Sequence, residues 1–301
     1  MTLSGTQHTI TAGPYEAVIT EQGGGLRTLT HRGREVILPH DPDQVTQAGF
    51  GQLLTPWPNR INHGKYEFEG VENLVPVNEP SRDCAIHGLV RWEPWVLQEQ
   101  TAASVRLSFR LLGRPGYPYR LDLGVTYALD AETGLTVGLS ASNTGTRNAP
   151  YGQSAHPYLT VGQPIDACEV VFGGTRYQPV DGRLIPDGAP TSVAGTPFDL
   201  REPRPFGDRR IDTAYTGLPF EDGRVWVRLS GGGRTAALWA DEAHPWIQLY
   251  TADDLDPARV RSGLAAEPMT CPPDAFNSGT DLISLKPGDT FTSSWGIQEQ
   301  P

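Results

Sequence analysis

The feature that most constrains the fold of this chain is an alternation of apolar and polar residues with a period of two. Successive side chains of a β-strand point to opposite faces of the sheet, so this pattern is typical of half-buried antiparallel strands. Turn-forming Gly, Pro, Asn and Asp residues separate the strand-like segments. The pattern is clearest in four segments of the 301-residue chain, at 104–112, 121–129, 135–141 and 224–230.

Helical periodicity is nearly absent, and we expect a short helix only at 252–263. Gly and Pro, with 34 and 27 residues, form about a fifth of the chain and are spread along it. Many short strands with Gly and Pro turns predict a sandwich or a barrel. No repeat or linker divides the chain, so we expect an all-β fold, a large antiparallel β-sandwich, formed by residues 1–301 as a single domain.

Charge and cysteine content limit the partners and the compartment. The formal net charge of −11 repels phosphate backbones and anionic lipids, so we expect no nucleic acid and no membrane as partner. The start of the chain does not resemble a signal peptide, and no apolar run is long enough to span a bilayer. Cys84, Cys168 and Cys271 are far apart and form no CxxC motif, which favours a reducing, cytoplasmic location and indicates no zinc site.

A carboxylate in an unusual setting is the first candidate for chemistry. Glu267 lies between Ala266 and Pro268, in the segment SGLAAEPMTCPPDAFNSG at 262–279. A carboxylate in a poorly hydrated setting is costly unless it is paired or neutralised. Glu267 is therefore either a loop acid that points to water or a catalytic base held by a stiff, proline-flanked loop.

Four other segments place polar residues in unusual company. Asn59 and Arg60 follow a Trp-Pro turn, so that Asn59 either caps the turn or binds a ligand, and Arg60 either binds a ligand or pairs with a surface acid. His87 and His156 lie among apolar and small residues, where a histidine is either a hydrogen-bonded core group or a proton carrier. Asp212 follows an isoleucine and carries little information alone.

Aromatic residues accompany these polar groups. Trp57 and Trp92 are either core residues or platforms for a sugar ring. The strand-like segment HPWIQLYT places Trp246, Gln248 and Tyr250 on one face, so Gln248 either holds a polar ligand or lines an exposed face of a sheet. The set as a whole suits carbohydrate chemistry, because it combines hydrogen-bonding groups for hydroxyls, aromatic faces for C–H patches, and two histidines and a glutamate for proton transfer.

Motifs of several other enzyme classes do not occur in the sequence. There is no GxSxG nucleophile motif, no HExxH metal motif, no P-loop and no GxGxxG. The Gly-rich segments GGGR and EQGGGLR lack the lysine and the strand–helix context of a phosphate-binding loop, so we interpret them as turns.

The order of the candidate segments resembles that of the aldose 1-epimerase (galactose mutarotase) family, and the resemblance spans most of the chain. The two segments nearest the C-terminus are the most specific, whereas the Asn-Arg and His-Gly pairs are weak alone. The segments are PNRINHGKYEFEG at 58–70, IHGL at 86–89, SAHPYL at 154–159, YQPVDGRLIPDG at 177–188, AAEPMTCPPDAFNSG at 265–279 and LKPGDTFTSSWGI at 285–297.

This resemblance implies a large antiparallel β-sandwich with an open sugar-binding cleft and no cofactor. It implies an isomerase that interconverts the α and β anomers of a hexose, with a free aldose as its partner. Glu267 matches the catalytic base, His156 matches the general acid, and His87 is implied as a helper near the ring oxygen or the anomeric oxygen. The implied substrate-binding residues are Asn59, Arg60, Asp212, Gln248, Trp57 and Tyr158.

The implied reaction requires an ionised glutamate and a protonated histidine at the same pH. One group takes the proton from O1–H of the sugar, and the other gives a proton to the ring oxygen O5. We expect attraction between Glu267 and His156 to shift their pKa values in these directions, and we expect a bell-shaped pH profile.

The sequence departs from the galactose enzymes near the second histidine. Ala155 stands where those enzymes usually have Asn, and Leu159 and Thr160 stand in place of Phe and Asn. The segment before Asn59 is TPWP rather than the usual Gly-Arg-containing stretch. These departures leave open whether the sugar is glucose, galactose or an anionic hexose, which Arg60 and neighbouring polar groups would favour.

Two other functions stay open. A glycoside hydrolase or lyase needs two carboxylates, and Glu267 with Asp212 or Asp274 would provide them. A non-catalytic sugar-binding protein on the same fold would tolerate loss of Glu267 or His156, and both are present. The sequence also leaves open a monomer or a homodimer, and whether Cys271 lies near the cleft or is, as we expect, a small buried hydrophobe.

Overall fold

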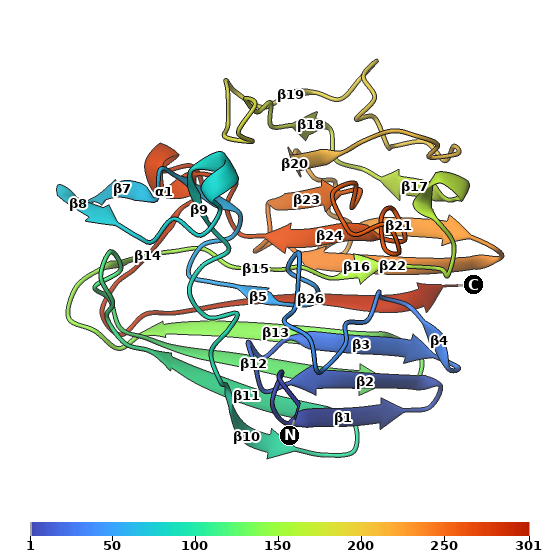
Figure 1. Ribbon diagram of the computed structural model, residues 1–301, viewed down its shortest axis with the longest axis horizontal. Helices are drawn as coiled ribbons and strands as arrows, with labels where there is room; N and C mark the ends of the chain where they lie inside the picture. The colour runs from blue at the N-terminus through green and yellow to red at the C-terminus, as the bar shows by residue number, and fades with distance from the viewer. Residues whose placement is uncertain (1, 301) are drawn as a thin grey trace.

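The structure is a computed structural model that describes residues 2–300. Within these residues the strands form seven sheets, and the α-helical structure is one short helix, α1 (Ala275–Ser278) (Figure 1). Two 3₁₀ turns cover Pro80–Arg82 and Ile165–Ala167. No helix in this part of the chain is long and apolar enough to cross a membrane. The predicted all-β class is confirmed.

The largest sheet has eight strands and contains the four segments in which the alternation is clearest. Burial follows the alternation, since Val105 and Leu107 are buried and Arg106 between them is exposed. Across the sheet, the strands are β10 (Val96–Gln100), β11 (Ser104–Leu111), β12 (Leu121–Asp130), β13 (Gly134–Asn143), β26 (Thr290–Gln300), β22 (Arg234–Asp241), β21 (Arg224–Gly231) and β17 (Glu169–Phe172).

A second sheet of six strands carries three of the candidate residues, Asp212, Gln248 and Glu267. Its strands pair antiparallel, so that residues opposite each other in the register share one face. Across the sheet, the strands are β16 (Tyr158–Leu159), β24 (Leu264–Met269), β23 (Trp246–Tyr250), β20 (Asp212–Thr216), β18 (Arg176–Tyr177) and β19 (Thr191–Ser192).

The remaining strands form one sheet of four strands and four small pairs. The four-stranded sheet consists of β1 (Gln7–Ala12), β2 (Tyr15–Thr20), β3 (Leu26–His31) and β4 (Arg34–Glu35). The pairs are β5 (Leu53–Leu54) with β15 (Ser154–Ala155), β6 (Arg60–Asn62) with β9 (Cys84–Ile86), β7 (Lys65–Phe68) with β8 (Val71–Leu74), and β14 (Ala149–Tyr151) with β25 (Ile283–Leu285).

The sheets stack in layers around one main core (Figure 1). Strands β1 and β2 pack on β11 and β12, and β16 packs on β22. The core between the layers takes side chains from all three larger sheets, among them Ile10, Leu29, Val125, Leu139 and Leu249. The predicted large antiparallel β-sandwich is confirmed, whereas a single domain over the whole chain stays a prediction.

The short helix expected at 252–263 is wrong, because this segment forms successive turns. The Asp256 side chain accepts a hydrogen bond of 3.0 Å from the N–H of Ala258, and the Asp256 carbonyl accepts one of 2.9 Å from Arg259. An aspartate that bonds backbone groups just beyond it favours a turn over a continued helix.

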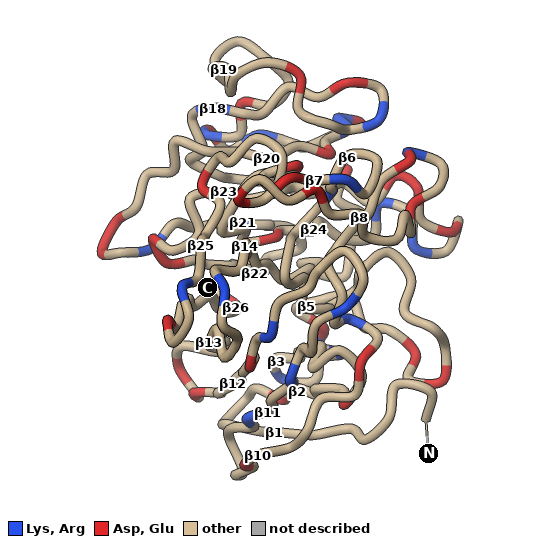
Figure 2. Tube along the Cα trace, turned by 90° about the vertical axis from the view of Figure 1, so that its left-hand side faces the viewer, with Lys and Arg blue, Asp and Glu red and all other residues tan. Residues whose placement is uncertain are grey.

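Charged residues are spread along the whole trace (Figure 2). Lys and Arg alternate with Asp and Glu in the loops and hairpins, and both signs meet around β6, β7 and β8 in this view. Arg60 of β6 lines the cleft described next.

Candidate active site

A cleft of about 270 Å³ lies over the face of the six-stranded sheet that points away from the main core. Strand alternation separates the two faces, because Glu267 and its neighbour Ala266 point to opposite sides, and Ala266 belongs to the main core. The cleft is lined by Ala48, Gly49, Asn59, Arg60, Glu79, Arg82, Ile86, His87, Arg91, His156, Tyr158, Asp212, Tyr250, Asp254, Leu255 and Glu267.

Glu267 lies in strand β24 and not in a loop, and only 2% of it is exposed. It stands opposite Gln248 of β23 in the register. Pro268 keeps its place in the same strand, opposite Ile247. Both alternatives left by the local sequence assumed a loop and are wrong in that respect, because the surrounding apolar residues pair as a buried strand.

His156 lies between β15 and β16, and its backbone is fixed by two hydrogen bonds. Its N–H donates to the carbonyl of Gln52 (3.0 Å), and its carbonyl accepts from the N–H of Gly51 (2.9 Å). Gly49 passes close beside the ring, since a Cβ there would lie 2.8 Å from Cδ2 of His156. These contacts aim Nε2 of His156 at Oε1 of Glu267, at a distance of 3.3 Å.

His87 follows strand β9 and is joined to Asn59 through the backbone. The N–H of His87 donates to the carbonyl of Asn59 (2.8 Å), and both residues have positive φ angles, 64° and 49°. A positive φ is uncommon in residues other than glycine and is found often at functional sites. The His87 ring meets the His156 ring edge to face, with centroids 5.4 Å apart.

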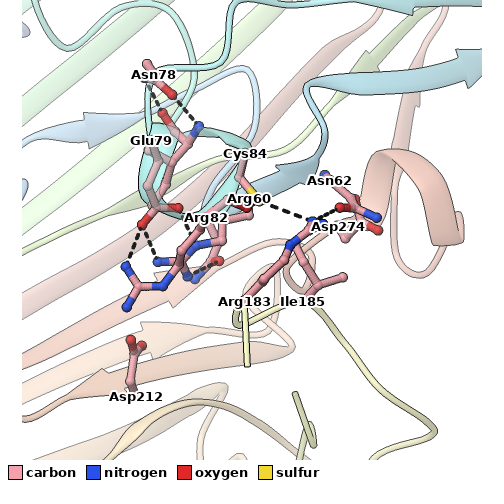
Figure 3. Close-up of polar contacts among 12 residues, drawn as sticks. Arg60, Asn62, Asn78, Glu79, Arg82, Cys84, Arg183, Ile185, Asp212 and Asp274 are labelled. Atoms are coloured by element: carbon pink, nitrogen blue, oxygen red, sulfur yellow. Dashed lines mark hydrogen bonds and ion pairs between the residues drawn. The ribbon is translucent and has the colours of Figure 1, made fainter. Parts of the chain in front are cut away.

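Arg60 in β6 is held by a carboxylate that the sequence did not single out. Its Nε and Nη2 donate to the two oxygens of Glu79, at 2.7 and 2.9 Å, and its Nη1 donates to Oδ1 of Asn59 at 3.3 Å (Figure 3). Arg82 donates to the same carboxylate at 3.1 Å. The proposed surface pairing of Arg60 is therefore wrong, since Arg60 is buried and lines the cleft.

Asp212 and Gln248 form a pair on adjacent strands. Nε2 of Gln248 donates to Oδ1 of Asp212 at 2.6 Å. Asp212 lines the cleft, whereas Gln248 lies behind the lining residues and supports Asp212. Gln248 thus belongs to the site, but its contact with the cleft is less direct than the sequence suggested.

Several buried polar atoms around the cleft have no hydrogen-bond partner in residues 2–300. Buried polar groups are nearly always satisfied, so such a concentration needs an explanation. The atoms are Nδ1 of His87, Nδ1 of His156, Oε1 of Gln248, Oε2 of Glu267 and Nε of Arg91. A ligand rich in hydroxyl groups would satisfy the donors and the acceptor on the four of these residues that line the cleft, which are all except Gln248.

Burial is the largest influence on the pKa values of Glu267 and His156. It raises the pKa of Glu267 well above its ordinary value, and the nearby charge of Asp212 raises it further. Burial also lowers the pKa of His156 to about 3. The expectation that mutual attraction sets both pKa values is wrong for this structure, because the loss of water disfavours both charges. At 3.3 Å the two groups are close enough to hold one proton between them.

Packing bears on the expectations for three individual residues. Trp57 is buried against Phe276 with ring centroids 5.8 Å apart and does not line the cleft, so its expected role in sugar binding is wrong. Tyr158 lines the cleft and stacks on the ring of His156 at 4.9 Å. Cys271 is a buried free thiol outside the cleft lining, as expected of a small hydrophobe.

Sequence analysis missed Glu79, Arg82, Arg91 and Asp254 among the lining residues. One signal could have found Glu79, because it precedes Pro80 in the same Glu-Pro arrangement as the catalytic candidate Glu267. The arginines had no local signal, since an arginine in a polar turn is usually exposed.

Comparisons with known proteins identify the family of the chain. A family model described as aldose 1-epimerase matches residues 6–298. YihR, an uncharacterised protein of Escherichia coli strain K12, is 36% identical over 304 residues, covering 100% of this chain and 95% of YihR. Human galactose mutarotase is 30% identical over 273 residues, covering 81% of this chain and 77% of the human protein.

Solved structures share the fold. An aldose epimerase homologue from C. elegans has a TM-score of 0.87 at 19% identity and covers 98% of both chains. A galactose 1-epimerase from Lactobacillus acidophilus has a TM-score of 0.84 at 20% identity and covers 97% of this chain and 93% of its own. The family match, together with the shared fold, defines the class of the protein as a carbohydrate-active isomerase. The chain belongs to the aldose 1-epimerase family, whose members act on sugars.

Proposed function

We propose that the protein interconverts the α and β anomers of a hexose, with Glu267 as base and His156 as acid. The observation that carries this proposal is the buried contact of 3.3 Å between Oε1 of Glu267 and Nε2 of His156. The two oxygens that exchange protons, O1 and O5, are bonded to the same sugar carbon. An acid and a base for this reaction must therefore lie side by side.

The reaction begins when the shared proton lies on His156. Glu267 then takes the proton from O1–H while His156 gives its proton to O5, so that C1=O1 forms and C1–O5 breaks. Rotation about C1–C2 presents the other face of the aldehyde. The same two groups reverse their transfers and close the ring. Each well-placed acid or base contributes roughly 10²–10⁴ in rate.

The other lining residues bind and orient the sugar in this proposal. Arg60 and Asn59 present donors, Asp212 presents an acceptor, and His87 lies beside His156 where it meets O1 or O5. Tyr158 supports the ring of His156. Binding energy from these contacts fixes C1 against the acid–base pair.

An anionic hexose is a second candidate substrate, and Arg91 favours it. The guanidinium of Arg91 lines the cleft, and within residues 2–300 no carboxylate pairs with it. Arginine is well suited to phosphate and sulfonate groups because its planar fork donates two parallel hydrogen bonds. The charge of Arg91 acts on both His87 and His156, so an anionic group bound by Arg91 would lie on the side of the cleft that holds the two histidines.

A glycoside-processing enzyme receives less support. Asp274 does not line the cleft and instead accepts a hydrogen bond of 2.9 Å from the N–H of Asn62. Asp212 lines the cleft with Glu267, but its carboxylate is bonded to Gln248. Release of reducing ends from a glycoside would favour this alternative over anomer exchange.

Polarimetry of freshly dissolved sugars tests the proposed function. We expect the protein to speed the equilibration of α-glucose, α-galactose or a hexose-6-sulfonate beyond the spontaneous rate. A preference for the sulfonate that is lost in Arg91→Gln would identify the anionic substrate. No acceleration of any sugar in this panel would contradict the proposal.

A further inference from the structure

In the part of the cleft drawn in Figure 3, both carboxylate oxygens of Glu79 accept hydrogen bonds from arginine side chains. Oε2 accepts from Nε of Arg60, and Oε1 accepts from Nη2 of Arg60 and from Nη1 of Arg82. A two-point contact of this kind fixes the plane and the direction of a guanidinium, which a single bond does not.

The geometry leaves part of Arg60 available to a ligand. A guanidinium has five N–H donors. Three of them are taken by Glu79 and by Asn59. Since Arg60 is buried and lines the cleft, the contact with Glu79 decides where the two remaining N–H groups point.

The backbone of Glu79 is itself anchored. Its N–H donates to the carbonyl of Cys84 (3.0 Å), and its carbonyl accepts from the N–H of Cys84 (3.3 Å). Asn78 next to it bonds both backbone groups of Ile86, at 2.6 and 3.0 Å. Glu79 is therefore built onto strand β9, the same strand that leads into His87.

Charge gives Glu79 a second effect on Arg60. Asp212 lies on the other side of the guanidinium groups of Arg60 and Arg82 from Glu79 (Figure 3). Burial raises the pKa of the Asp212 carboxyl above its ordinary value, and the charges of Arg60 and Arg82 oppose this rise. Without Glu79, Asp212 would be the nearest charged acceptor, and Arg60 would turn toward it and occupy an acceptor that the sugar needs.

We propose that Glu79 is a positioning residue for the sugar: it acts through Arg60, which it holds in the orientation that binds a hexose hydroxyl. This inference rests on the proposed anomer exchange. It assigns Glu79 no contact with the reacting atoms, so its loss weakens binding more than it slows chemistry.

Glu79→Gln tests the proposal, because glutamine keeps the size of the side chain but loses the charge and the two-point contact. We expect KM to rise about tenfold, as for loss of a charge-assisted hydrogen bond, with kcat within about threefold. Glu79→Asp keeps the charge on a shorter side chain, and we expect a smaller rise in KM. The matched control is Glu72→Gln, which removes an exposed pair with Lys65; neither residue lines the cleft, so neither constant should change.

A double-mutant cycle with Arg60→Gln separates positioning from general loosening of the loop. If Glu79 acts through Arg60, adding Glu79→Gln to Arg60→Gln raises KM less than about twofold further. If Glu79→Gln raises KM equally in the wild type and in Arg60→Gln, the proposal is overturned. The proposal is also overturned if the wild type accelerates a sugar and Glu79→Gln leaves KM for that sugar unchanged. If the wild type accelerates no sugar, the proposed function fails and this inference fails with it. If the wild type is active and only the results for the variants are negative, this inference fails alone.

Discussion

Glu267 and His156, the proposed base and acid, are ionisable groups that are both buried, which is energetically costly. Each side chain is almost fully buried, at 3% and 6% exposure, and the two lie 3.3 Å apart. Burial disfavours the charged form of both, so one proton held between them is the arrangement with least unpaired charge. In the proposed reaction, a bound sugar would add hydrogen bonds that stabilise the ionised arrangement which ring opening needs.

The shared proton defines a pH dependence. Below the working range a second proton binds, and because burial lowers the pKa of His156 to about 3, this limb should lie well below the ordinary histidine value. Above the range the last proton leaves, and because burial raises the pKa of Glu267, this limb should lie well above the ordinary glutamate value. We expect a broad bell in kcat/KM, measured by NMR exchange of anomeric protons. A single step centred near the ordinary histidine pKa of about 6.5 would contradict the shared proton.

Glu267→Gln should stabilise the fold at alkaline pH. The folded-state pKa of Glu267 is raised, so its contribution to stability is present at low pH and is lost as pH rises toward that pKa. Glutamine does not titrate, so we expect the difference in Tm between variant and wild type to grow from pH 4.5 to pH 8, by about 2–4 °C for each 1 kcal/mol. Thermal unfolding at the two pH values measures this, and a pH-independent difference would be the contrary result.

Which residues lie together in the cleft was predictable only where an ordered set of motifs carried them. Glu267 and His156 lie 111 positions apart, and no local property pairs them; the resemblance did. Glu79 was missed because its two-point partner Arg60 lies 19 positions away, and Arg91 was missed because an arginine in a polar turn is usually exposed. Trp57 was misassigned because the tryptophan of a Trp-Pro turn can be buried or exposed. In the structure its ring packs against Phe276 in the core.

At the scale of elements, the segment that follows Glu267 has a structural task. Asp274 accepts hydrogen bonds from the N–H of Asn62 (2.9 Å) and from Nδ2 of Asn277 (2.7 Å), and its own N–H donates to the carbonyl of Arg60 (2.8 Å). Through these hydrogen bonds, the segment that follows β24 is bonded to β6. Strand β24 carries Glu267, and strand β6 carries Arg60.

Asp274→Ala should loosen this attachment. It removes two hydrogen bonds, and it places alanine at a φ of 58°, a conformation that alanine adopts at a cost of about 1–2 kcal/mol. We expect a loss of about 2–4 kcal/mol in unfolding free energy by urea denaturation. Asp274→Asn is the control, because asparagine keeps an acceptor oxygen and tolerates positive φ. Equal losses in both variants would argue against the hydrogen bonds as the cause.

Strands were the most predictable elements, because the alternation in 104–112 and 121–129 comes directly from the two faces of a sheet. The segment 252–263 was not predictable in the same way. Its composition permits a helix, and the hydrogen bond from Ala258 to the Asp256 side chain replaces helical pairing with a turn.

At the scale of the whole molecule, Glu299 joins the sheets. It lies near the end of β26 and accepts from Nη2 of Arg234 in β22 (2.6 Å) and from Arg34 in β4 (3.0 Å), with His31 of β3 at 3.5 Å. Burial by itself raises the pKa of Glu299, but the bond from Arg234 and the surrounding cations hold it below its ordinary value. Nothing in the sequence near the C-terminus signalled this role.

Glu299→Gln should weaken the contact between the four-stranded and eight-stranded sheets. Loss of one partner leaves Arg234 partly buried without its carboxylate, which typically costs about 3 kcal/mol. Because the folded pKa is lowered, this stabilisation is present above the ordinary glutamate pKa and is lost as pH falls. Urea unfolding at pH 7 and pH 3.5 should show a gap between wild type and variant that shrinks in acid. The exposed Glu16→Gln is the control, and a gap that is equal at both pH values would contradict the ion pair.

The central claim is that the pair of Glu267 and His156 exchanges the anomers of a sugar. The most direct measurement is NMR exchange of the anomeric protons of the sugar that the polarimetry panel selects, with the wild type, Glu267→Gln and His156→Gln. We predict enhanced exchange with the wild type and a loss of roughly 10²–10⁴ with each variant, while both variants stay folded. Enhanced exchange that survives intact in Glu267→Gln would contradict the claim.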